Sequence, residues 1–321
     1  MNAPLRMLLL AMACLSAAAA QAQAYPSKPV RIIVGQAAGG GMDTLARLLA
    51  QKLTISLGQP VIVEVKAGAA GIIGADFVAK APPDGYTLLV APVGSMVFTQ
   101  ILYSKLPYSV LRDFAPISMV ATFPLLLVVN STQPFMSVPE LVAYMKANPA
   151  KSNYGGSGPA FQFASELFKI KTATKAEFIQ YKGTNEAILG IISGDLLLSL
   201  ADTGPAAALI ASGKLRALAT TSPRRLPSLP NVPTMAEAGL PDMEIQFWAG
   251  IFAPAGTPPA IVKRLEAEVN RILKMADISE RMEGIQVTPA GGSSEEFAAI
   301  LASDLARWSA VAKAANIKPA D

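Results

Sequence analysis

The sequence contains no histidine, and its one cysteine, Cys14, lies in an apolar segment near the start of the chain. These absences exclude catalysis by serine–histidine or cysteine–histidine pairs, and they remove the usual side-chain ligands of zinc, iron and copper. Carboxylates, lysines, hydroxyl groups and backbone amides remain available for chemistry. We therefore expect no catalytic residues, no metal site and no cofactor.

Charge is also scarce. Charged residues make up 16% of the chain and leave a net charge of +4, without a dense block of lysine and arginine or an alternation of basic and aromatic residues. Nucleic acid is therefore not an expected partner. Beyond the first residues, no apolar run approaches about 18 residues without glycine, proline or a charge, so we expect no membrane-spanning helix.

The first 24 residues have the pattern of a cleaved signal peptide. Arg6 is their only charge, residues 7–20 are apolar or small, and Ala22-Gln23-Ala24 supplies a cleavage site of the A-x-A type. We expect residues 1–24 to be removed and the mature chain to be secreted. The alternative is a lipoprotein anchored through Cys14, although Ala11 stands where such a signal prefers leucine.

Strand and helix patterns alternate after this segment. Apolar, β-rich runs at residues 30–34, 61–65 and 86–91 are separated by helical patterns at 42–57 and 72–81. This β-α-β-α-β order predicts a parallel sheet with right-handed crossovers.

A second α/β unit follows, joined to later segments by a Pro-rich connection at residues 222–241. We expect the chain to cross between the two units near Ala121 and again within that connection. The predicted first domain comprises residues 25–121 and 238–321, and the second comprises 122–237. Their expected elements include strands at 125–129, 178–181, 196–201, 215–220 and 245–252, a strand ending at 154, and helices at 138–147, 161–171, 185–193, 258–274 and 294–315.

A glycine cluster separates the first predicted strand from the first predicted helix. Gly35 and Gly40 have the spacing of a Walker A loop, but Gly41 and Met42 stand where Lys and Ser/Thr are required, and no G-x-G-x-x-G pattern is present. The nucleotide-binding interpretation therefore fails. Backbone N–H groups at the start of a helix still favour an anion, with Asp43 as a capping or dipole-compensating residue.

Similar loops follow other predicted strands, at residues 92–95, 154–159 and 201–205. Ligands of open α/β sheets bind beyond the carboxyl ends of the strands, so we expect these loops to converge on one cleft. The loop around Ser157 resembles the nucleophile elbow of hydrolases, but no histidine is present to act as its base.

Several longer stretches resemble the substrate-binding proteins of tripartite tricarboxylate transporters, the Bug family. The resemblance covers essentially the whole mature chain and is carried by YPSKPVRIIVGQAAGGGMDTLARLLAQKL, LGQPVIVEVKAGAAGIIGADFVAKAPPDGYTLLV, LPYSVLRDFAPISMVA, YKGTNEAILGIISGD, LRALATTSPRRLPSLPNVPTMAEAGLP and FAPAGTPPAIVKRLEAEVNRIL. It implies a two-lobed α/β protein with the type II periplasmic binding protein fold. Such a protein is a monomer that closes about a hinge on a small carboxylate and delivers it to membrane transporter subunits.

The resemblance also implies which residues hold the ligand. They come from the loop after the first strand, a Gly/Ser loop in the second domain, the loop after the third strand and one acidic position at a strand end: Gln36, Ala37, Ala38, Gly39, Gly40, Gly41, Ser157, Gly158, Phe161, Gln162, Gly94, Ser95 and Asp202.

This chain departs from the usual family pattern in both glycine loops. Gly35, Gln36, Ala37 and Ala38 replace much of the proline pattern that is usual in the first loop. The second loop is shorter than usual, with Gln162 where a histidine is usual. The ligand can therefore differ from those of better-known members. Helix termini alone contribute too little for micromolar binding, so apolar contacts must add to them, with core packing as the competing role for each candidate: Met96, Phe161, Phe247 and Trp248.

Two other functions stay open from the sequence. One is a secreted enzyme that uses Asp43 or Asp202 together with a lysine. The other is a ligand-presenting sensor component that docks on a membrane receptor rather than on a transporter.

Overall fold

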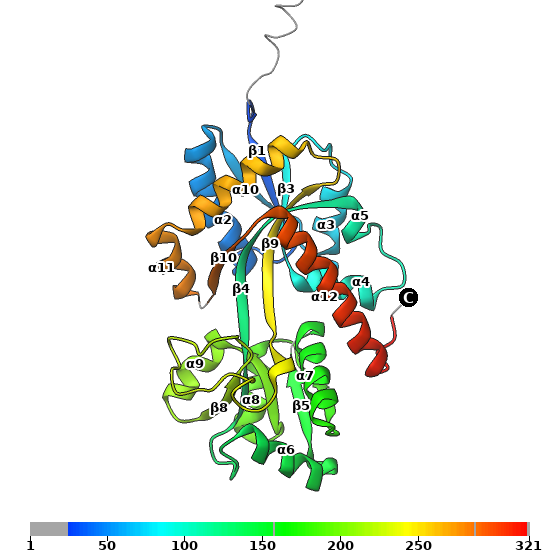
Figure 1. Ribbon diagram of the computed structural model, residues 1–321, viewed down its shortest axis with the longest axis vertical. Helices are drawn as coiled ribbons and strands as arrows, with labels where there is room; N and C mark the ends of the chain where they lie inside the picture. Colours follow the sequence, from blue (N-terminus) through cyan, green and yellow to red (C-terminus); the bar gives the residue numbers. More distant parts are fainter. Residues whose placement is uncertain (1–24, 157, 286, 320–321) are drawn as a thin grey trace, which may run out of the picture.

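The computed structural model describes residues 25–156, 158–285 and 287–319. The expected signal peptide, including Cys14, and the candidate residue Ser157 lie outside these residues. The described chain is elongated, with two α/β lobes placed end to end and two long strands, β4 and β9, running between them (Figure 1). No helix among the described residues is both long and apolar enough to cross a membrane.

The first lobe is built on a sheet in the order β2-β1-β3-β9-β4-β10. The parallel core is β1 (Val30–Val34) with β2 (Val61–Val65) and β3 (Thr87–Pro92) on either side. This confirms the parallel arrangement predicted from the β-α-β-α-β pattern. Antiparallel strands complete the sheet: β9 (Gln246–Pro254), the first part of β4 (Phe114–Asn130) and β10 (Thr288–Gly291).

Helices cover both faces of this sheet (Figure 1). Alternate β1 residues face opposite ways: Ile32 packs with Leu49 of α2, and Ile33 packs with Val78 of α3, which gives the lobe two apolar cores. One face carries α2 (Gly41–Leu57), α10 (Pro259–Leu273) and α11 (Ala276–Gly284). The other carries η1 (Ala69–Gly71), α3 (Ile72–Ala79), η2 (Gly94–Phe98), α4 (Thr99–Leu102), α5 (Val110–Asp113) and α12 (Ser294–Ala314).

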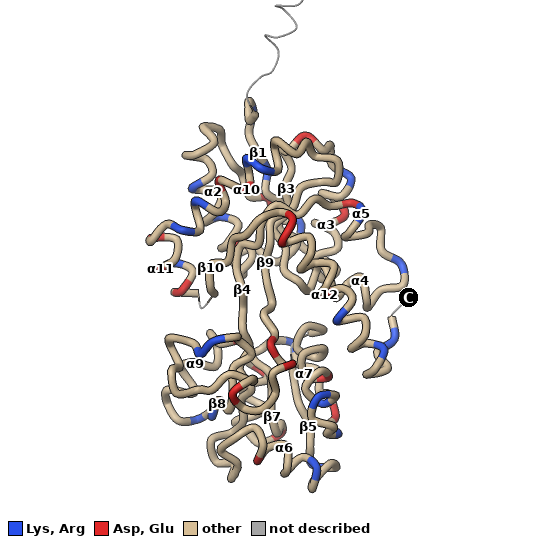
Figure 2. The backbone as a smooth tube through the Cα atoms, viewed as in Figure 1, with Lys and Arg blue, Asp and Glu red and all other residues tan. Residues whose placement is uncertain are grey.

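The second lobe has its own sheet, in which the last part of β4 lies between β7 and β8. Its strands are β5 (Asn153–Gly156), β6 (Glu177–Gln180), β7 (Leu198–Asp202) and β8 (Leu215–Thr220). Its helices are α6 (Val138–Ala147), η3 (Pro149–Lys151), α7 (Pro159–Thr172), α8 (Thr184–Ser193), α9 (Thr203–Ala211) and η4 (Pro241–Met243). Lysines, arginines and carboxylates are distributed over both lobes (Figure 2).

The β4 strand is much longer than the sequence predicted. The expected strand covered residues 125–129, whereas β4 has 17 residues and begins at Phe114. The first part of β4 was not predicted because it contains Pro116 and Pro124. Proline is tolerated in a sheet only at edges, bulges and strand ends. The pairing of β4 with β9 indeed shifts register between Pro116 and Ser118.

The chain returns toward the first lobe through β9. The Ile245 N–H donates to the carbonyl oxygen of Thr221 at 3.1 Å. The strand β9 then begins at Gln246, opposite Pro124 of β4. The domain boundaries given above stay a prediction.

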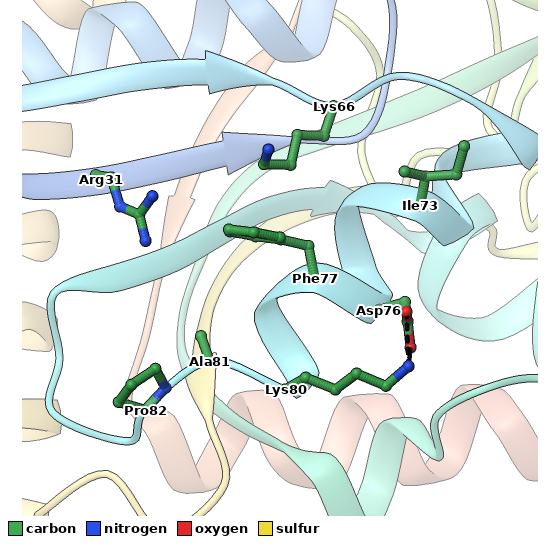
Figure 3. Close-up of a pocket in the computed structure, with 8 residues that line it drawn as sticks. All are labelled: Arg31, Lys66, Ile73, Asp76, Phe77, Lys80, Ala81 and Pro82. Atoms are coloured by element: carbon green, nitrogen blue, oxygen red, sulfur yellow. Dashed lines mark hydrogen bonds and ion pairs between the residues drawn. The ribbon is translucent and has the colours of Figure 1, made fainter.

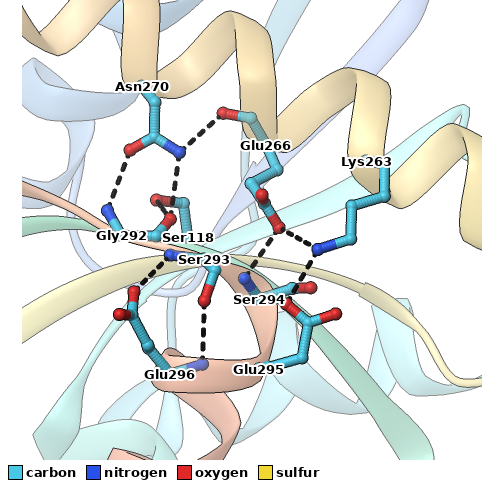
Figure 4. A network of polar contacts seen from close by, with 9 residues as sticks. All are labelled: Ser118, Lys263, Glu266, Asn270, Gly292, Ser293, Ser294, Glu295 and Glu296. Atoms are coloured by element: carbon cyan, nitrogen blue, oxygen red, sulfur yellow. Dashed lines mark hydrogen bonds and ion pairs between the residues drawn. The ribbon is translucent and has the colours of Figure 1, made fainter.

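A polar network fixes the start of α12 to the first lobe (Figure 4). Asn270 of α10 brackets Gly292, donating to its carbonyl oxygen at 2.9 Å and accepting from its N–H at 2.8 Å. Ser118 of β4 donates to the same carbonyl oxygen at 3.0 Å, and Ser293 and Glu296 form a capping box. This anchorage sets the direction of α12, which extends from the first lobe to α7 of the second.

Candidate ligand-binding site

A cleft of about 500 Å³ lies between the two lobes. The loops after β1, β2 and β3 line it from the first lobe, together with the segment through α4, and the start of α7 lines it from the second. The lining residues are Gly35, Gln36, Ala37, Ala67, Gly68, Ala70, Gly71, Pro92, Gly94, Ser95, Phe98, Thr99, Leu102, Tyr103, Pro159 and Ala160. Loops far apart in the sequence thus meet at the carboxyl ends of parallel strands.

Only some of the candidate residues line this cleft. Gln36, Ala37, Gly94 and Ser95 line it. The others that the structure describes are not among its lining residues. They occupy the rest of the first loop and the start of α2 (Ala38, Gly39, Gly40, Gly41), the start of α7 (Gly158, Phe161, Gln162) and the end of β7 (Asp202).

Ser95 joins the three first-lobe loops into one wall. Its buried Oγ accepts a hydrogen bond from Nε2 of Gln36 at 2.8 Å and donates to the carbonyl oxygen of Ala70 at 2.7 Å. Its own carbonyl oxygen accepts from Oγ1 of Thr99 at 2.7 Å. We call the loops after β1, β2 and β3 the cleft wall, because these bonds tie each loop to the next.

Two glycines allow the loops of the cleft wall to pack closely against one another. A Cβ atom on Gly35 would lie 2.8 Å from Cα of Gly71, which is closer than real Cβ contacts. A Cβ atom on Gly71 would meet Oγ of Ser95 and would lie 2.7 Å from Nε2 of Gln36. The first residue of the glycine cluster therefore serves backbone packing, while Gly39, Gly40 and Gly41 shape the turn into α2.

The loop after β2 has an unusual backbone. Ala69 and Ala70 have φ angles of 46° and 55°, and they lie between Gly68 at 142° and Gly71 at 94°. Alanine in this region is strained, at a cost of about 1–3 kcal/mol per residue, and such strain concentrates at ligand sites. The sequence prediction missed this loop. The rule that loops after parallel strands converge could have found it, because β2 is parallel to β1.

Asp43 has a structural role at the start of α2. Its carboxylate accepts from the N–H of Gly39 at 2.8 Å and pairs with Arg47 at 2.9 Å. The hydrogen bond from Arg47, and then that from Gly39, hold the pKa of Asp43 below its usual value. Asp43 therefore stays ionised and compensates the positive end of α2, as the sequence suggested.

The pKa of Asp202 is shifted in the opposite direction to that of Asp43. Burial raises the pKa of its carboxyl, and a 3.1 Å hydrogen bond from Oγ1 of Thr184 partly offsets that rise. Neither Asp43 nor Asp202 is among the described residues that line the cleft.

The apolar candidates pack in the interior. Met96, Phe247 and Trp248 are almost fully buried in the apolar core, and the ring of Phe161 lies 6.3 Å from that of Phe247. Met96, Phe247 and Trp248 are therefore core residues. Phe161 is only partly buried, and its part in ligand binding stays a prediction.

Phe98 instead reaches the cleft and also joins the lobes. It lines the cleft while its ring lies 4.9 Å from that of Phe163 in α7, 5.3 Å from that of Trp308 in α12 and 5.9 Å from that of Phe247 in β9. We call Phe98, Phe163, Phe247 and Trp308 the inter-lobe aromatic cluster. The cluster therefore packs η2 of the first lobe against α7 of the second.

Comparison with known proteins shows to which family this architecture belongs. The family model of the tripartite tricarboxylate transporter family receptor matches residues 45–317. The chain belongs to this family. It is 35% identical to protein BugT of Bordetella pertussis over 94% of both chains.

Solved structures agree with this membership. The Rhodopseudomonas palustris protein Rpa4515, solved with adipate, is 33% identical and has a TM-score of 0.77, with 92% of this chain and all of that one covered. MatC from the same organism, solved with malate, is 29% identical with a TM-score of 0.72, over 89% of this chain and 99% of that one. The two-lobed α/β fold of type II binding proteins, predicted from the sequence, is confirmed.

Proposed function

We propose that this protein is the receptor of a tripartite tricarboxylate-type transporter, which captures a small carboxylate in the cleft and delivers it to the membrane subunits. It works in the periplasm after removal of residues 1–24, as a monomer, and by binding rather than catalysis. The observation that carries the proposal is the cleft itself, which both lobes line at the carboxyl ends of their strands. Relatives of the same fold bind the carboxylates adipate and malate.

The cleft suits an anion that is held by neutral groups. No charged side chain is among its described lining residues. The positive end of α7 begins there with Gly158 and Pro159, and no acidic residue stands in its first turn. A helix N-terminus favours an anion by roughly 0.3–2 kcal/mol. We propose that this end of α7 meets the ligand carboxylate, with amides of the residue 36–41 and 157–162 loops.

Helix dipoles alone cannot give useful affinity, since micromolar binding requires about 8 kcal/mol. Alanines, prolines, Phe98 and Leu102 line the cleft, and each buried methylene of a ligand adds about 0.8 kcal/mol. We therefore expect affinity to rise with the apolar surface of the ligand until it fills the cleft.

Closure of the lobes supplies the remaining contacts. We propose that the lobes meet where β4 passes Pro124 and β9 begins at Gln246, which places the second boundary slightly beyond the one expected from the sequence. A ligand that touches both lobes binds the closed state more tightly and shifts the population toward it.

A thermal-shift screen of the refolded protein against mono-, di- and tricarboxylates, aromatic acids included, tests the proposal. Ligand at about 100 times its dissociation constant adds about 2.7 kcal/mol, or several degrees in Tm. A selective shift with a few carboxylates is expected. A flat panel, with a known family member responding, would contradict the proposal.

A matched pair of variants locates the response. Ala160→Glu places a carboxylate at the start of α7 in the cleft and should abolish the shift. Ala143→Glu makes the same change on the exposed side of α6 and should preserve it. An equal response from both variants would place the ligand elsewhere.

A further inference from the structure

A second hollow, of about 650 Å³, lies on the first lobe beside α3 (Figure 3). It is lined by Arg31 of β1, by Lys66 directly after β2, by one side of α3 and by residues 80–82 that follow α3. Because β2 is the edge strand of the sheet and α3 has only eight residues, this corner of the sheet is only partly covered. We call this surface the α3 face.

Two cations of the α3 face flank one aromatic ring, and Arg31 has an ion-pair partner whereas Lys66 has none among the described residues. Lys66 places its ammonium 4.2 Å from the centre of the Phe77 ring and has no carboxylate within ion-pair distance among the described residues. Arg31 lies 5.6 Å from the same ring, and its nearest carboxylate, on Glu64, is 3.7 Å away. Figure 3 shows both cationic groups close to the ring. The hollow thus has an aromatic centre flanked by positive charge.

The remaining charges of the hollow cancel. Lys80 pairs with Asp76 at 2.7 Å, one turn away on α3. Asp76 is the only carboxylate among the described residues that line the hollow. Glu64 offsets the charge of Arg31 from just outside it, so Lys66 supplies the net positive charge.

Exposed apolar side chains border these cations. Ile73 is 52% exposed at the start of α3, and Ile62 is 49% exposed beside Arg31 in the register of β1 and β2. Exposed aliphatic, aromatic and arginine side chains together are typical of protein interfaces.

We propose that the α3 face docks an acidic, partly apolar segment of a partner protein. Carboxylates of that segment pair with Arg31 and Lys66, and its apolar side chains cover Ile73 and Phe77. A membrane surface fits less well, because recognition of anionic lipid uses clusters of about 4–8 lysines and arginines.

One loop connects the α3 face to the cleft along the chain. Lys66 and Ile73 of the α3 face flank the 67–71 segment in the sequence, and Ala67, Gly68, Ala70 and Gly71 of that segment line the cleft. A ligand that changes this strained loop therefore changes the docking surface, and by linkage docking changes ligand affinity. This coupling rests on the proposed function, whereas docking itself does not.

The test uses the full chain and a fluorescent peptide of alternating glutamate and leucine, followed by anisotropy. The double charge reversal R31E/K66E should weaken binding roughly tenfold or more. The matched reversal K146E/K151E, on exposed lysines of the second lobe, should change it less than about twofold. K66Q keeps Arg31 and its partners intact and should give an intermediate loss. Thermal unfolding checks that each variant is folded.

Four results would overturn the proposal. Equal weakening by both reversals would indicate general electrostatics, and no weakening by R31E/K66E would place the peptide elsewhere. Phosphatidylglycerol vesicles that bind through Arg31 and Lys66 when the peptide does not would indicate a membrane surface. Full displacement of the peptide by millimolar inorganic phosphate would indicate a small-anion site. The thermal-shift screen with carboxylates measures ligand binding in the cleft separately. The docking proposal and the ligand-binding proposal can therefore be contradicted independently.

Discussion

The two lobes contribute to the cleft in different ways. The first lobe presents three loops that Ser95 locks together, with a strained backbone at Ala69 and Ala70. The second lobe presents Pro159 and Ala160 at the start of one helix. The difference suggests that the first lobe shapes the pocket before ligand arrives, and the second closes over it.

The two helix starts show the same contrast. In α2, Asp43 stands in the first turn and compensates the helix dipole, whereas the first turn of α7 has no acidic residue. An anion in the cleft therefore gains more from α7 than from α2. The second lobe, which lines the cleft with Pro159 and Ala160 alone among the described residues, supplies the more favourable helix dipole.

Truncation of Phe98 should have the largest effect, because its ring belongs to both the cleft and the inter-lobe aromatic cluster. Phe98→Ala should lower the free energy of unfolding by about 3–5 kcal/mol, as measured in urea. Phe98→Leu preserves much of the volume and should lower it by less than about 1.5 kcal/mol. Equal, small losses would mean that the cluster does not hold the lobes together.

Gly71→Ala should have the next largest effect. The new Cβ would collide with Ser95 and Gln36 at a φ of 94°, so we expect a loss of roughly 2–3 kcal/mol in stability. We also expect ligand affinity, measured by calorimetry, to fall at least about tenfold. The matched control is Gly284→Ala at the end of α11, outside the cleft lining, where a Cβ meets no atom within 4 Å. Similar affinities for the two variants would show that the cleft wall is not preformed.

Asp43→Asn tests the compensated helix start. The folded-state pKa of Asp43 is lowered, so its ionised form contributes stability above the unfolded pKa, and that contribution is lost as pH falls through the folded pKa. We expect a loss of about 1–2 kcal/mol at pH 7. The difference from wild type should shrink below about pH 4, as followed by urea unfolding across pH. A constant difference would assign the effect to packing.

Asp202→Asn should have the smallest effect, with the opposite dependence on pH. The folded-state pKa of Asp202 is raised, so its stability contribution is complete below the unfolded pKa and is lost as pH rises through the folded pKa. Asparagine can still accept from Thr184 and carries no charge. The variant should equal or exceed wild type by up to about 1 kcal/mol at pH 7 and lose that advantage in acid. Clear destabilisation at pH 7 would mean that the ionised carboxylate has a favourable partner.

The sequence predicted elements well where local pattern decides them. It gave the bounds of β1 and α6 as the structure has them, because their apolar spacing and flanking residues agree. It missed the first part of β4, where prolines are accommodated by bulges and by pairing with a strand more than a hundred residues away in the chain. The strand β10, which pairs with the distant β4, was missed for the same reason.

For the site, the convergence rule found Gln36 and Ser95 but was not applied to the loop after β2. The roles of Phe98 and Trp308 could not be predicted, because their contact depends on how η2 and α12 pack. Phe161 and Gln162 were assigned from the resemblance, and their part in ligand binding stays a prediction.

The central claim is that ligand draws the second lobe onto a preformed cleft wall. Replacing Cys14 by serine leaves the chain free of cysteine, so spin labels can be placed on Lys105→Cys in the first lobe and Lys182→Cys in the second. Pulsed electron paramagnetic resonance would measure the distance between the two labels, with and without the carboxylate that gives the largest Tm shift in the screen. The account predicts a shorter, narrower distribution with ligand and no change in the Ala160→Glu variant. An unchanged distribution with ligand shown to be bound would contradict it.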